Sequence, residues 1–119
     1  MEPNYLQQFK KGSLEMLLLC LIARGETYGY EIMTELNRRG GGIPGGVREG
    51  TVYPMLYRLQ KAGQLRCRLG PSPNGGTKKY YSLTEEGART LAELLAFWKT
   101  YSQWIDEWIQ TCNGWEESK

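Results

Sequence analysis

Residues 49–63 read EGTVYPMLYRLQKAG, and this stretch decides the fold that we predict for the chain. At 100° per residue, its apolar side chains fall on one side of a helix, and its tyrosines and cations fall on the other. The apolar side carries Val52, Met55, Leu56 and Leu59, and the polar side carries Tyr53, Pro54, Tyr57, Arg58 and Lys61. Proline is tolerated only near the first turn, so we expect the helix to begin between residues 49 and 51. Gly63 can end it.

The polar side of this helix is suited to a groove of DNA, because it offers hydroxyls and cations while the other side packs. The backbone N–H groups near its start suit a phosphate. The DNA-binding residues predicted on this helix are Gly50, Thr51, Tyr53, Pro54, Tyr57, Arg58 and Lys61. Two other roles stay open. Tyr53 can fix the helix start on an ordinary solvated face, and Arg58 can pair with a surface glutamate, a contact worth about 0–1 kcal/mol.

The composition narrows the class of protein. A chain of 119 residues with 40% hydrophobic residues suits one domain with its own core and one appended element. No apolar run approaches the ~20 residues that span a bilayer, and the N-terminus lacks a signal-peptide pattern, so we expect a cytoplasmic protein without a membrane partner. There is no histidine, and Cys20, Cys67 and Cys112 lack metal-ligand spacing. We therefore expect neither an enzyme nor a metal or cofactor site.

The charge is distributed unevenly along the chain. Residues 1–83 contain twelve Lys/Arg and six Asp/Glu, whereas residues 84–119 contain three Lys/Arg and seven Asp/Glu. A basic first part followed by an acidic tail indicates that only the first part meets a polyanion.

Three helices are expected in the basic part. Residues 13–24 are apolar nearly all round, which predicts a helix buried on two sides. A second helix is predicted over residues 28–38 with Thr27 as its N-cap. The glycine-rich residues 40–46 form a connector to the helix of residues 49–63. Helix, connector, helix is the order of a helix-turn-helix, although this connector is longer than the simplest turn.

A β-hairpin follows and predicts a wing. Residues 65–69 alternate strictly, residues 70–77 are a loop, and residues 78–83 return as the second strand. The lysines and arginines of the hairpin suit DNA phosphates or the minor groove, although lysine at a strand edge also discourages edge-to-edge pairing. Tyr28 and Tyr30 can reach phosphates, with core packing the favoured role for Tyr28. The DNA-binding residues predicted here are Tyr30, Lys78, Lys79 and Tyr80, with Arg66 and Arg68 as further candidates.

A long final helix, capped by Thr84, is predicted to pair with another helix. Its apolar residues recur every seven positions in two series offset by three, and this a/d seam favours helix–helix packing. The series are Leu91, Trp98, Ile105, Cys112 and Leu94, Tyr101, Trp108, Trp115. We expect pairing with the first helix across a homodimer. The predicted interface is Leu14, Leu17, Leu18, Leu21, Leu91, Leu94, Trp98, Tyr101, Ile105, Trp108 and Cys112. Cys112 can form an intersubunit disulfide, but an inert thiol is favoured in a reducing cytosol.

Four segments resemble the PadR family of bacterial transcriptional regulators. They are KGSLEMLLL (11–19), YGYEI (28–32), EGTVYP (49–54) continuing through Leu56, Arg58 and Leu59, and KYYSLTEEG (79–87). The resemblance spans roughly residues 10–90 in the right order. It implies a dimeric winged helix-turn-helix that binds a promoter operator, often as a repressor released by a small effector. The chain departs from the family pattern in its loose connector and in a wing loop without arginine, so that wing contacts rest on Lys78 and Lys79.

The resemblance also implies an effector site, because similar regulators accept flat aromatic molecules between their subunits. The effector-binding residues considered are Trp98, Leu94, Leu95 and Tyr101. Tryptophans on such a seam are more often dimer core than a ligand cage.

We therefore predict an α+β, mostly α chain. Residues 1–83 form a winged helix-turn-helix with a two-stranded wing, and residues 84–119 form a dimerisation helix. The predicted function is sequence-specific binding of double-stranded DNA as a homodimeric repressor, with recognition helices about one turn (~34 Å) apart on a pseudo-palindromic operator. The alternatives are a winged helix used for protein interaction and a ligand sensor without direct operator binding.

Overall fold

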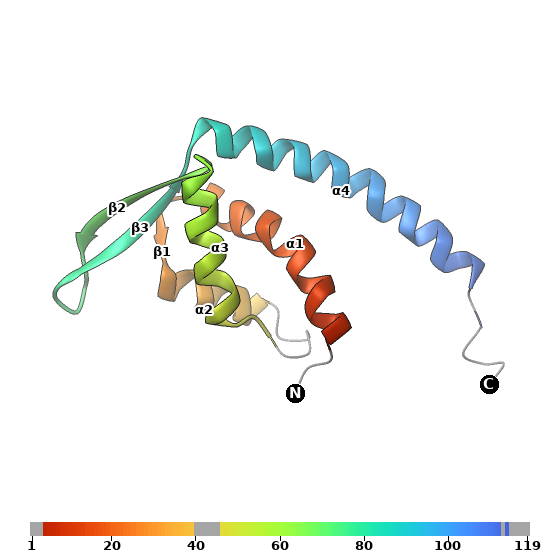
Figure 1. Ribbon diagram of the computed structural model, residues 1–119, viewed down its shortest axis with the longest axis horizontal. Helices are drawn as coiled ribbons and strands as arrows, with labels where there is room; N and C mark the ends of the chain where they lie inside the picture. The colour runs from red at the N-terminus through yellow and green to blue at the C-terminus, as the bar shows by residue number, and fades with distance from the viewer. Residues whose placement is uncertain (1–3, 40–45, 113, 115–119) are drawn as a thin grey trace.

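The chain forms four helices and a small antiparallel sheet in the parts that the computed structural model describes, residues 4–39, 46–112 and 114 (Figure 1). The elements are α1 (Asn4–Ala23), β1 (Thr27–Tyr28), α2 (Gly29–Arg39), α3 (Glu49–Lys61), β2 (Leu65–Pro71), β3 (Thr77–Leu83) and α4 (Glu85–Thr111). The predicted α+β, mostly α fold is confirmed. The connector, apart from Gly46, and Trp115 lie outside the described residues.

The core lies between α1, α2, α3 and the base of the sheet. Its fully buried side chains are Leu18, Leu19, Ile22, Ile32, Val52, Leu56 and Leu59. The first helix begins at Asn4, nine residues before the predicted start at Ser13. The prediction placed the start where the apolar run begins. Once a helix has formed, adding a further residue costs little free energy, so the helix extends through good helix formers such as Gln and Lys. Lys10 in this extension donates a hydrogen bond of 2.7 Å to the Gly46 carbonyl.

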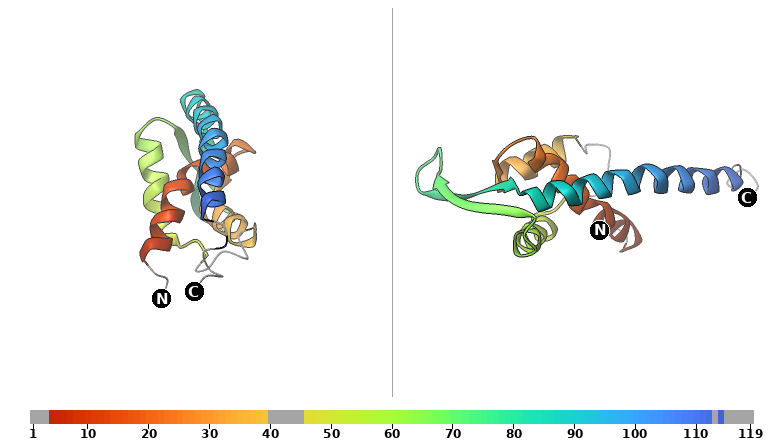
Figure 2. Two further views of the ribbon diagram at one scale, coloured as in Figure 1. Left: turned by 90° about the vertical axis from the view of Figure 1, so that its right-hand side faces the viewer. Right: turned by 90° about the horizontal axis from the view of Figure 1, so that it is seen from above.

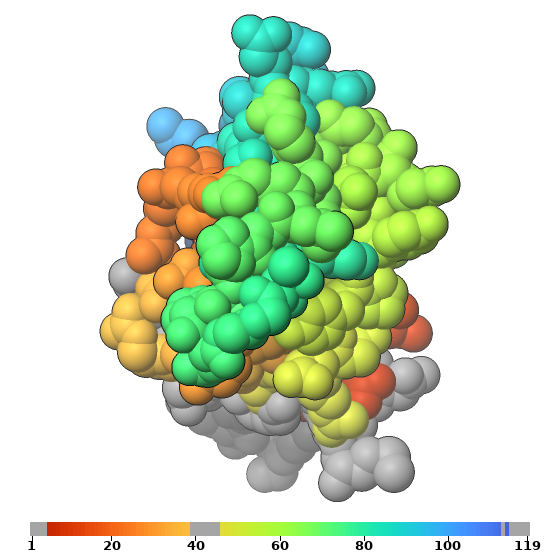
Figure 3. Space-filling view, turned by 90° about the vertical axis from the view of Figure 1, so that its left-hand side faces the viewer, coloured from red at the N-terminus to blue at the C-terminus, as the bar shows by residue number. Residues whose placement is uncertain are grey.

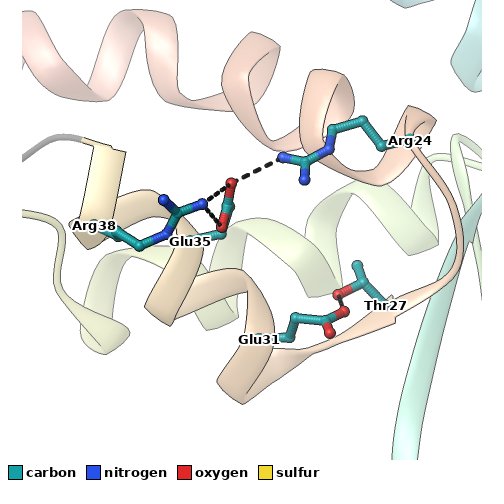
Figure 4. A network of polar contacts seen from close by, with 5 residues as sticks. All are labelled: Arg24, Thr27, Glu31, Glu35 and Arg38. Atoms are coloured by element: carbon teal, nitrogen blue, oxygen red, sulfur yellow. Dashed lines mark hydrogen bonds and ion pairs between the residues drawn. The ribbon is translucent and has the colours of Figure 1, made fainter.

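The sheet has three strands in the order β1-β3-β2, so the wing hairpin gains an extra short strand. Thr27 and Tyr28 pair with Tyr81 and Tyr80 of β3, and α2 begins only at Gly29. The prediction that Tyr28 begins the second helix with Thr27 as its N-cap was therefore wrong, because backbone pairing with a distant strand outweighs local helix signals. The Thr27 hydroxyl instead donates to the Glu31 carboxylate (Figure 4).

Polar contacts fix α2 and the chain that leads to α3. Glu35 on α2 accepts from Arg24 at 3.1 Å and from Arg38 at 2.8 Å, which links α2 to the residue following α1 (Figure 4). The Asn37 side chain accepts from the Val47 N–H at 2.8 Å and donates to the Val47 carbonyl at 3.1 Å. These two bonds hold residue 47 against α2 just before α3 begins.

A tight corner joins α3 to α4. Thr84 caps α4 as predicted, because its hydroxyl oxygen accepts from the Gly87 N–H at 3.0 Å. The same hydroxyl donates to the Gly63 carbonyl at 2.7 Å, just after α3. A Cβ on Gly87 would lie 2.1 Å from the Gln64 carbonyl oxygen, so only glycine fits here. The start of α4 is thus fixed against the end of α3.

Helix α4 packs by its first turns and then leaves the rest of the chain. Leu91 is buried and Leu94 lies partly against the core, next to α1. Beyond them the helix extends away from the other elements, with its outer turns projecting past the core (Figures 1 and 2).

Candidate nucleic-acid interface

Helix α3 separates its apolar and polar residues as predicted. It begins at Glu49, and its buried residues are Val52, Met55, Leu56 and Leu59. Tyr53 and Tyr57 on the other side are 41% and 58% exposed. The Lys61 ammonium lies 5.7 Å from the centroid of the Tyr57 ring, one turn further along the helix. Hydroxyls and a cation therefore share one exposed side of α3.

A crevice of 380 Å³ lies between α3, the start of α2 and strand β3. It is lined by Tyr28, Gly29, Tyr30, Tyr53, Tyr57, Gln60, Lys78, Lys79 and Tyr81. Figure 3 shows this side of the molecule, with the wing between α3 and the segment of β1 and α2. The structure thus brings together five predicted DNA-binding residues from three elements: Tyr30, Tyr53, Tyr57, Lys78 and Lys79. Sequence reasoning missed Gln60, whose place beside the wing depends on the hairpin's position.

Burial raises the pKa of Tyr81 above its ordinary value. This hydroxyl therefore stays neutral at physiological pH and adds no negative charge to the crevice. Lysines and neutral hydroxyls are the side chains that bind phosphate oxygens in protein–DNA complexes.

Tyr53 has a structural role as well as an exposed side. A Cβ on Gly29 would lie 2.5 Å from the Tyr53 hydroxyl oxygen, so the end of this side chain lies directly on the glycine backbone. The contact fixes the first turn of α3 against the first turn of α2. Gly29 is therefore a close-packing position between the two helices.

Arg58 lies on a different flank of α3. Its guanidinium is 3.4 Å from the Glu15 carboxylate of α1, and it does not line the crevice. Arg58 thus makes the pair with a surface glutamate that was the alternative role for it, and its DNA contact stays a prediction. Both side chains are about half exposed, so the pair contributes only ~0–1 kcal/mol to stability.

The wing carries a chain of charge and ring contacts. Arg68 makes two hydrogen bonds of 2.7 Å with Glu26, which precedes β1. Its guanidinium carbon lies 4.7 Å from the Tyr80 ring centroid, and the Tyr80 ring meets Tyr28 edge-on at 5.7 Å. The Lys78 ammonium lies 3.6 Å from the Tyr28 centroid. The hydrogen bond from Arg68 holds the pKa of Glu26 below its ordinary value, and Glu26 raises the pKa of Arg68.

The Tyr80 hydroxyl donates to the Pro71 carbonyl at 2.6 Å. The structure therefore gives Tyr80 a role inside the wing, because its ring and its hydroxyl both contact residues of the chain, and its DNA contact stays a prediction. Neither contact was visible in the local pattern of residues.

A model of the PadR-like transcriptional regulators matches residues 18–93, which include α2, α3 and the wing. The chain belongs to the PadR-like family. It is 37% identical to a PadR-like transcriptional regulator of known structure from Bacillus cereus, covering 87% of this chain and 97% of that one with a TM-score of 0.74. A PadR family regulator from Eggerthella lenta superposes with a TM-score of 0.77 at 30% identity over 90% of each chain.

Two relatives are similar in sequence. An uncharacterized protein X from Lysinibacillus sphaericus is 33% identical over 101 residues, which are 84% of this chain and 91% of that protein. The transcriptional regulator YqjI of Escherichia coli is 31% identical over 87 residues, but these cover only 39% of its length.

The outer part of α4 in this PadR-like chain exposes a row of aromatic rings. Phe97 stacks on Tyr101 at 5.1 Å, Tyr101 lies 5.9 Å from Trp104, and Trp104 meets Trp108 edge-on at 6.3 Å between centroids. Trp98 and Leu95 are also exposed. Sequence reasoning missed Phe97, because a seven-residue repeat selects a stripe narrower than the exposed face.

An apolar groove of 670 Å³ lies along the side of α1 that faces the start of α3. Leu17, Leu21 and Cys20 of α1 line it together with Leu36 of α2 and Val47. The predicted interface is corrected at Leu14, Leu18 and Leu91, which are buried within the single chain and leave little or no surface for a partner. Leu17, Trp98, Tyr101 and Trp108 are exposed, Leu21, Leu94 and Ile105 are half-buried, and Cys112 is an exposed free thiol.

Two absences concern the residues that the structure describes. No helix in the described ranges combines the length and apolar character needed to cross a membrane. Among these same residues, no three His, Cys, Asp or Glu side chains lie where they could hold a metal ion.

Proposed function

We propose that this PadR-like protein is a homodimeric repressor that binds a pseudo-palindromic operator, with α3 of each protomer in the major groove. One observation carries the proposal: α3 buries its whole apolar side and presents Tyr53, Tyr57 and Lys61 beside the crevice that Lys79 lines. A helix whose free side lies next to a basic wing has the arrangement of a winged recognition helix.

Phosphate contacts would supply most of the affinity. The winged helix-turn-helix, which we assign to residues 1–83, contains twelve of the fifteen Lys/Arg. Affinity should therefore fall steeply with salt, by a slope that reports the number of phosphates neutralised. Base preference would come from side chains that reach base edges, for which Tyr57 and Gln60 are the candidates.

The homodimer is supported by two apolar surfaces that the single chain leaves bare. One is the aromatic row of α4, which belongs to the segment 84–119 that we assign to dimerisation, and the other is the groove along α1. Contiguous exposed apolar surfaces of this kind mark interaction sites. Asp106 and Glu107 lie on the outer part of α4, whereas Lys11 and Arg48 border the groove, so the charges of the two surfaces are complementary.

A flat aromatic effector is a further part of the proposal. Trp98, Leu95 and Tyr101 are exposed on α4 next to half-buried Leu94. In a dimer formed through α4 these rings would be partly covered, and a slot between them would suit a planar apolar molecule. Quenching of tryptophan fluorescence by planar compounds in the wild type, and its loss in Trp98→Ala, would support the site. No quenching across a broad panel would contradict it.

The operator proposal is tested by fluorescence anisotropy with fragments of the DNA upstream of the protein's own gene. The variant Tyr57→Ala/Lys61→Ala removes a hydroxyl and a cation from α3, so we expect binding to weaken by at least about tenfold. Lys99→Ala, which removes an exposed cation on α4, is the matched control and should bind like the wild type. Equal binding by the wild type and the α3 variant would contradict the assignment. A folded dimer that binds none of the fragments would favour the protein-interaction alternative.

A further inference from the structure

Helix α3 begins without a side-chain cap of its own. Arg48 precedes it with an extended backbone, and the Arg48 side chain makes no capping hydrogen bond. A serine, threonine, aspartate or asparagine at this place would accept from a backbone N–H group of the first turn, as Thr84 does for α4. Without such a cap, the place of the first turn of α3 depends more strongly on what holds the residues just before Arg48.

One side chain of α2 binds both backbone groups of Val47. The Asn37 Oδ1 atom accepts from the Val47 N–H at 2.8 Å, and Asn37 Nδ2 donates to the Val47 carbonyl at 3.1 Å. Nδ2 also donates to the Met33 carbonyl at 3.0 Å, one turn earlier on α2. A side-chain amide carries two donor hydrogens and an acceptor oxygen, so all three bonds can form together. Asn37 therefore binds Val47 as a neighbouring β-strand would, and is itself held to α2.

Gly46 and Lys10 add a second attachment. Gly46 has a φ of 57°, a left-handed conformation that glycine adopts without strain. A Cβ at this position would lie 2.8 Å from Asn37 Oδ1, so the glycine also makes room for the amide. The Lys10 ammonium of α1 donates to the Gly46 carbonyl at 2.7 Å. Helices α1 and α2 thus both bind the two residues that lead to Arg48 and α3.

The place of α3 matters more for reading bases than for attracting phosphates. A hydrogen bond to a base edge needs a donor–acceptor distance of about 2.7–3.2 Å, so a small displacement of the helix removes it. The attraction between a cation and a phosphate changes little over the same displacement, because Coulomb energy falls only with the inverse of distance. A misplaced α3 should therefore lose affinity for the operator much more than for unrelated DNA.

We propose that Asn37 and Lys10 are positioning residues for operator recognition, because they set where the first turn of α3 lies. They act through Gly46 and Val47 and not by touching the DNA. Both polar atoms of the Asn37 amide are engaged within the chain, and Lys10 lines the groove along α1, away from the crevice beside the wing. This inference rests on the proposed operator binding and assigns residues that hold the recognition helix in place.

Two duplexes distinguish positioning from a general loss of fold or charge. One is the upstream fragment that the wild type binds, and the other is a scrambled duplex of the same length and composition. Anisotropy titrations of the full-length dimer compare them at one salt concentration. For Asn37→Ala we expect affinity for the operator fragment to fall at least about tenfold, and affinity for the scrambled duplex to change less than about twofold. Thr34→Ala, at an exposed residue one turn earlier on α2, is the matched control and should bind both duplexes like the wild type.

Variants at two adjacent lysines test the attachment to α1. Lys10→Met removes the donor to Gly46, whereas Lys11→Met removes the same charge from an exposed neighbour that also borders the groove. We expect Lys10→Met to lower the ratio of operator to scrambled affinity at least about threefold, and Lys11→Met to leave the ratio unchanged. Lys10→Arg keeps a donor and a cation and should restore the ratio. Circular dichroism and analytical ultracentrifugation confirm that each variant is a folded dimer.

The ratio of operator to scrambled affinity decides the outcome. An unchanged ratio in either Asn37→Ala or Lys10→Met would overturn the positioning assignment alone, whether both affinities stay at the wild-type level or fall together. A ratio that Lys11→Met lowers as much as Lys10→Met would overturn it as well. Wild-type protein that binds the two duplexes equally, or binds neither, would overturn the operator proposal and the positioning assignment together.

Discussion

Large apolar side chains are buried in the helix-turn-helix part of the chain and exposed on the outer part of α4. In the first, Leu18, Ile32 and Leu56 have no accessible surface, because three helices and a sheet close over them. In the second, Trp104 and Trp108 are 53% and 59% exposed on a helix that packs only at its first turns. The comparison separates apolar residues that stabilise the single chain from those that the single chain leaves exposed, which we propose as surface for a second protomer.

Truncating the core should have the largest effect on stability. Leu56→Ala removes a fully buried side chain of α3 and leaves a cavity, so we expect the free energy of unfolding to fall by about 2–5 kcal/mol. Urea denaturation followed by circular dichroism measures the loss. A change below about 1 kcal/mol would show that the core of this part is looser than its burial indicates.

Truncating the α4 rings should instead affect association. For Trp104→Ala/Trp108→Ala we expect the dimer dissociation constant to rise at least about tenfold, because buried tryptophans dominate interface energies. Analytical ultracentrifugation over a concentration series measures it, with Lys99→Ala on the same helix as the control. If the wild type is monomeric at high concentration, or if both variants dissociate alike, the contrast between the two parts is wrong.

The corner between the two parts gives a smaller effect. A Cβ at Gly87 meets backbone at 2.1 Å, so Gly87→Ala must shift the start of α4, and we expect a loss of about 1–3 kcal/mol. Gly12→Ala is the matched control, since nothing lies within 4 Å of its Cβ position in α1. This variant should gain about 0.5–1 kcal/mol from helix propensity. Thermal unfolding of the two variants measures both changes. Stabilisation by Gly87→Ala as well as by Gly12→Ala would contradict the close approach of Gly87 to the Gln64 carbonyl.

The smallest effect concerns the exposed pair of Glu26 and Arg68. The folded-state pKa of Glu26 is lowered, so its contribution to stability is fully present above its ordinary value of 4.5 and is lost as the pH falls through the lowered value. The difference in urea midpoint between wild type and Glu26→Gln should therefore be small at pH 7 and shrink below pH 4.5. A difference that grows on acidification would contradict the lowered pKa.

The sequence predicted those features whose signals are local. The apolar face of α3, the Thr84 cap and the hairpin each depend on a few neighbouring residues. Strand β1 was missed because two residues carry no periodic pattern and its partner strand lies about fifty positions later. The Glu26–Arg68 contact, between residues 42 positions apart, and the place of Gln60 in the crevice likewise require the folded chain. The assignment of Leu14 and Leu18 to an interface failed because an all-round apolar helix does not reveal which side its own chain covers.

The Thr84 corner has a geometric consequence for a dimer held by α4. One hydroxyl binds both the turn after α3 and the first turn of α4, and Gly87 lets the two backbones touch. Helix α3 and helix α4 of each protomer are therefore expected to move together as one rigid unit. A ligand that rotated α4 of one protomer against α4 of the other would change the distance between the two α3 helices. The two helices would then fit successive turns of a DNA duplex differently.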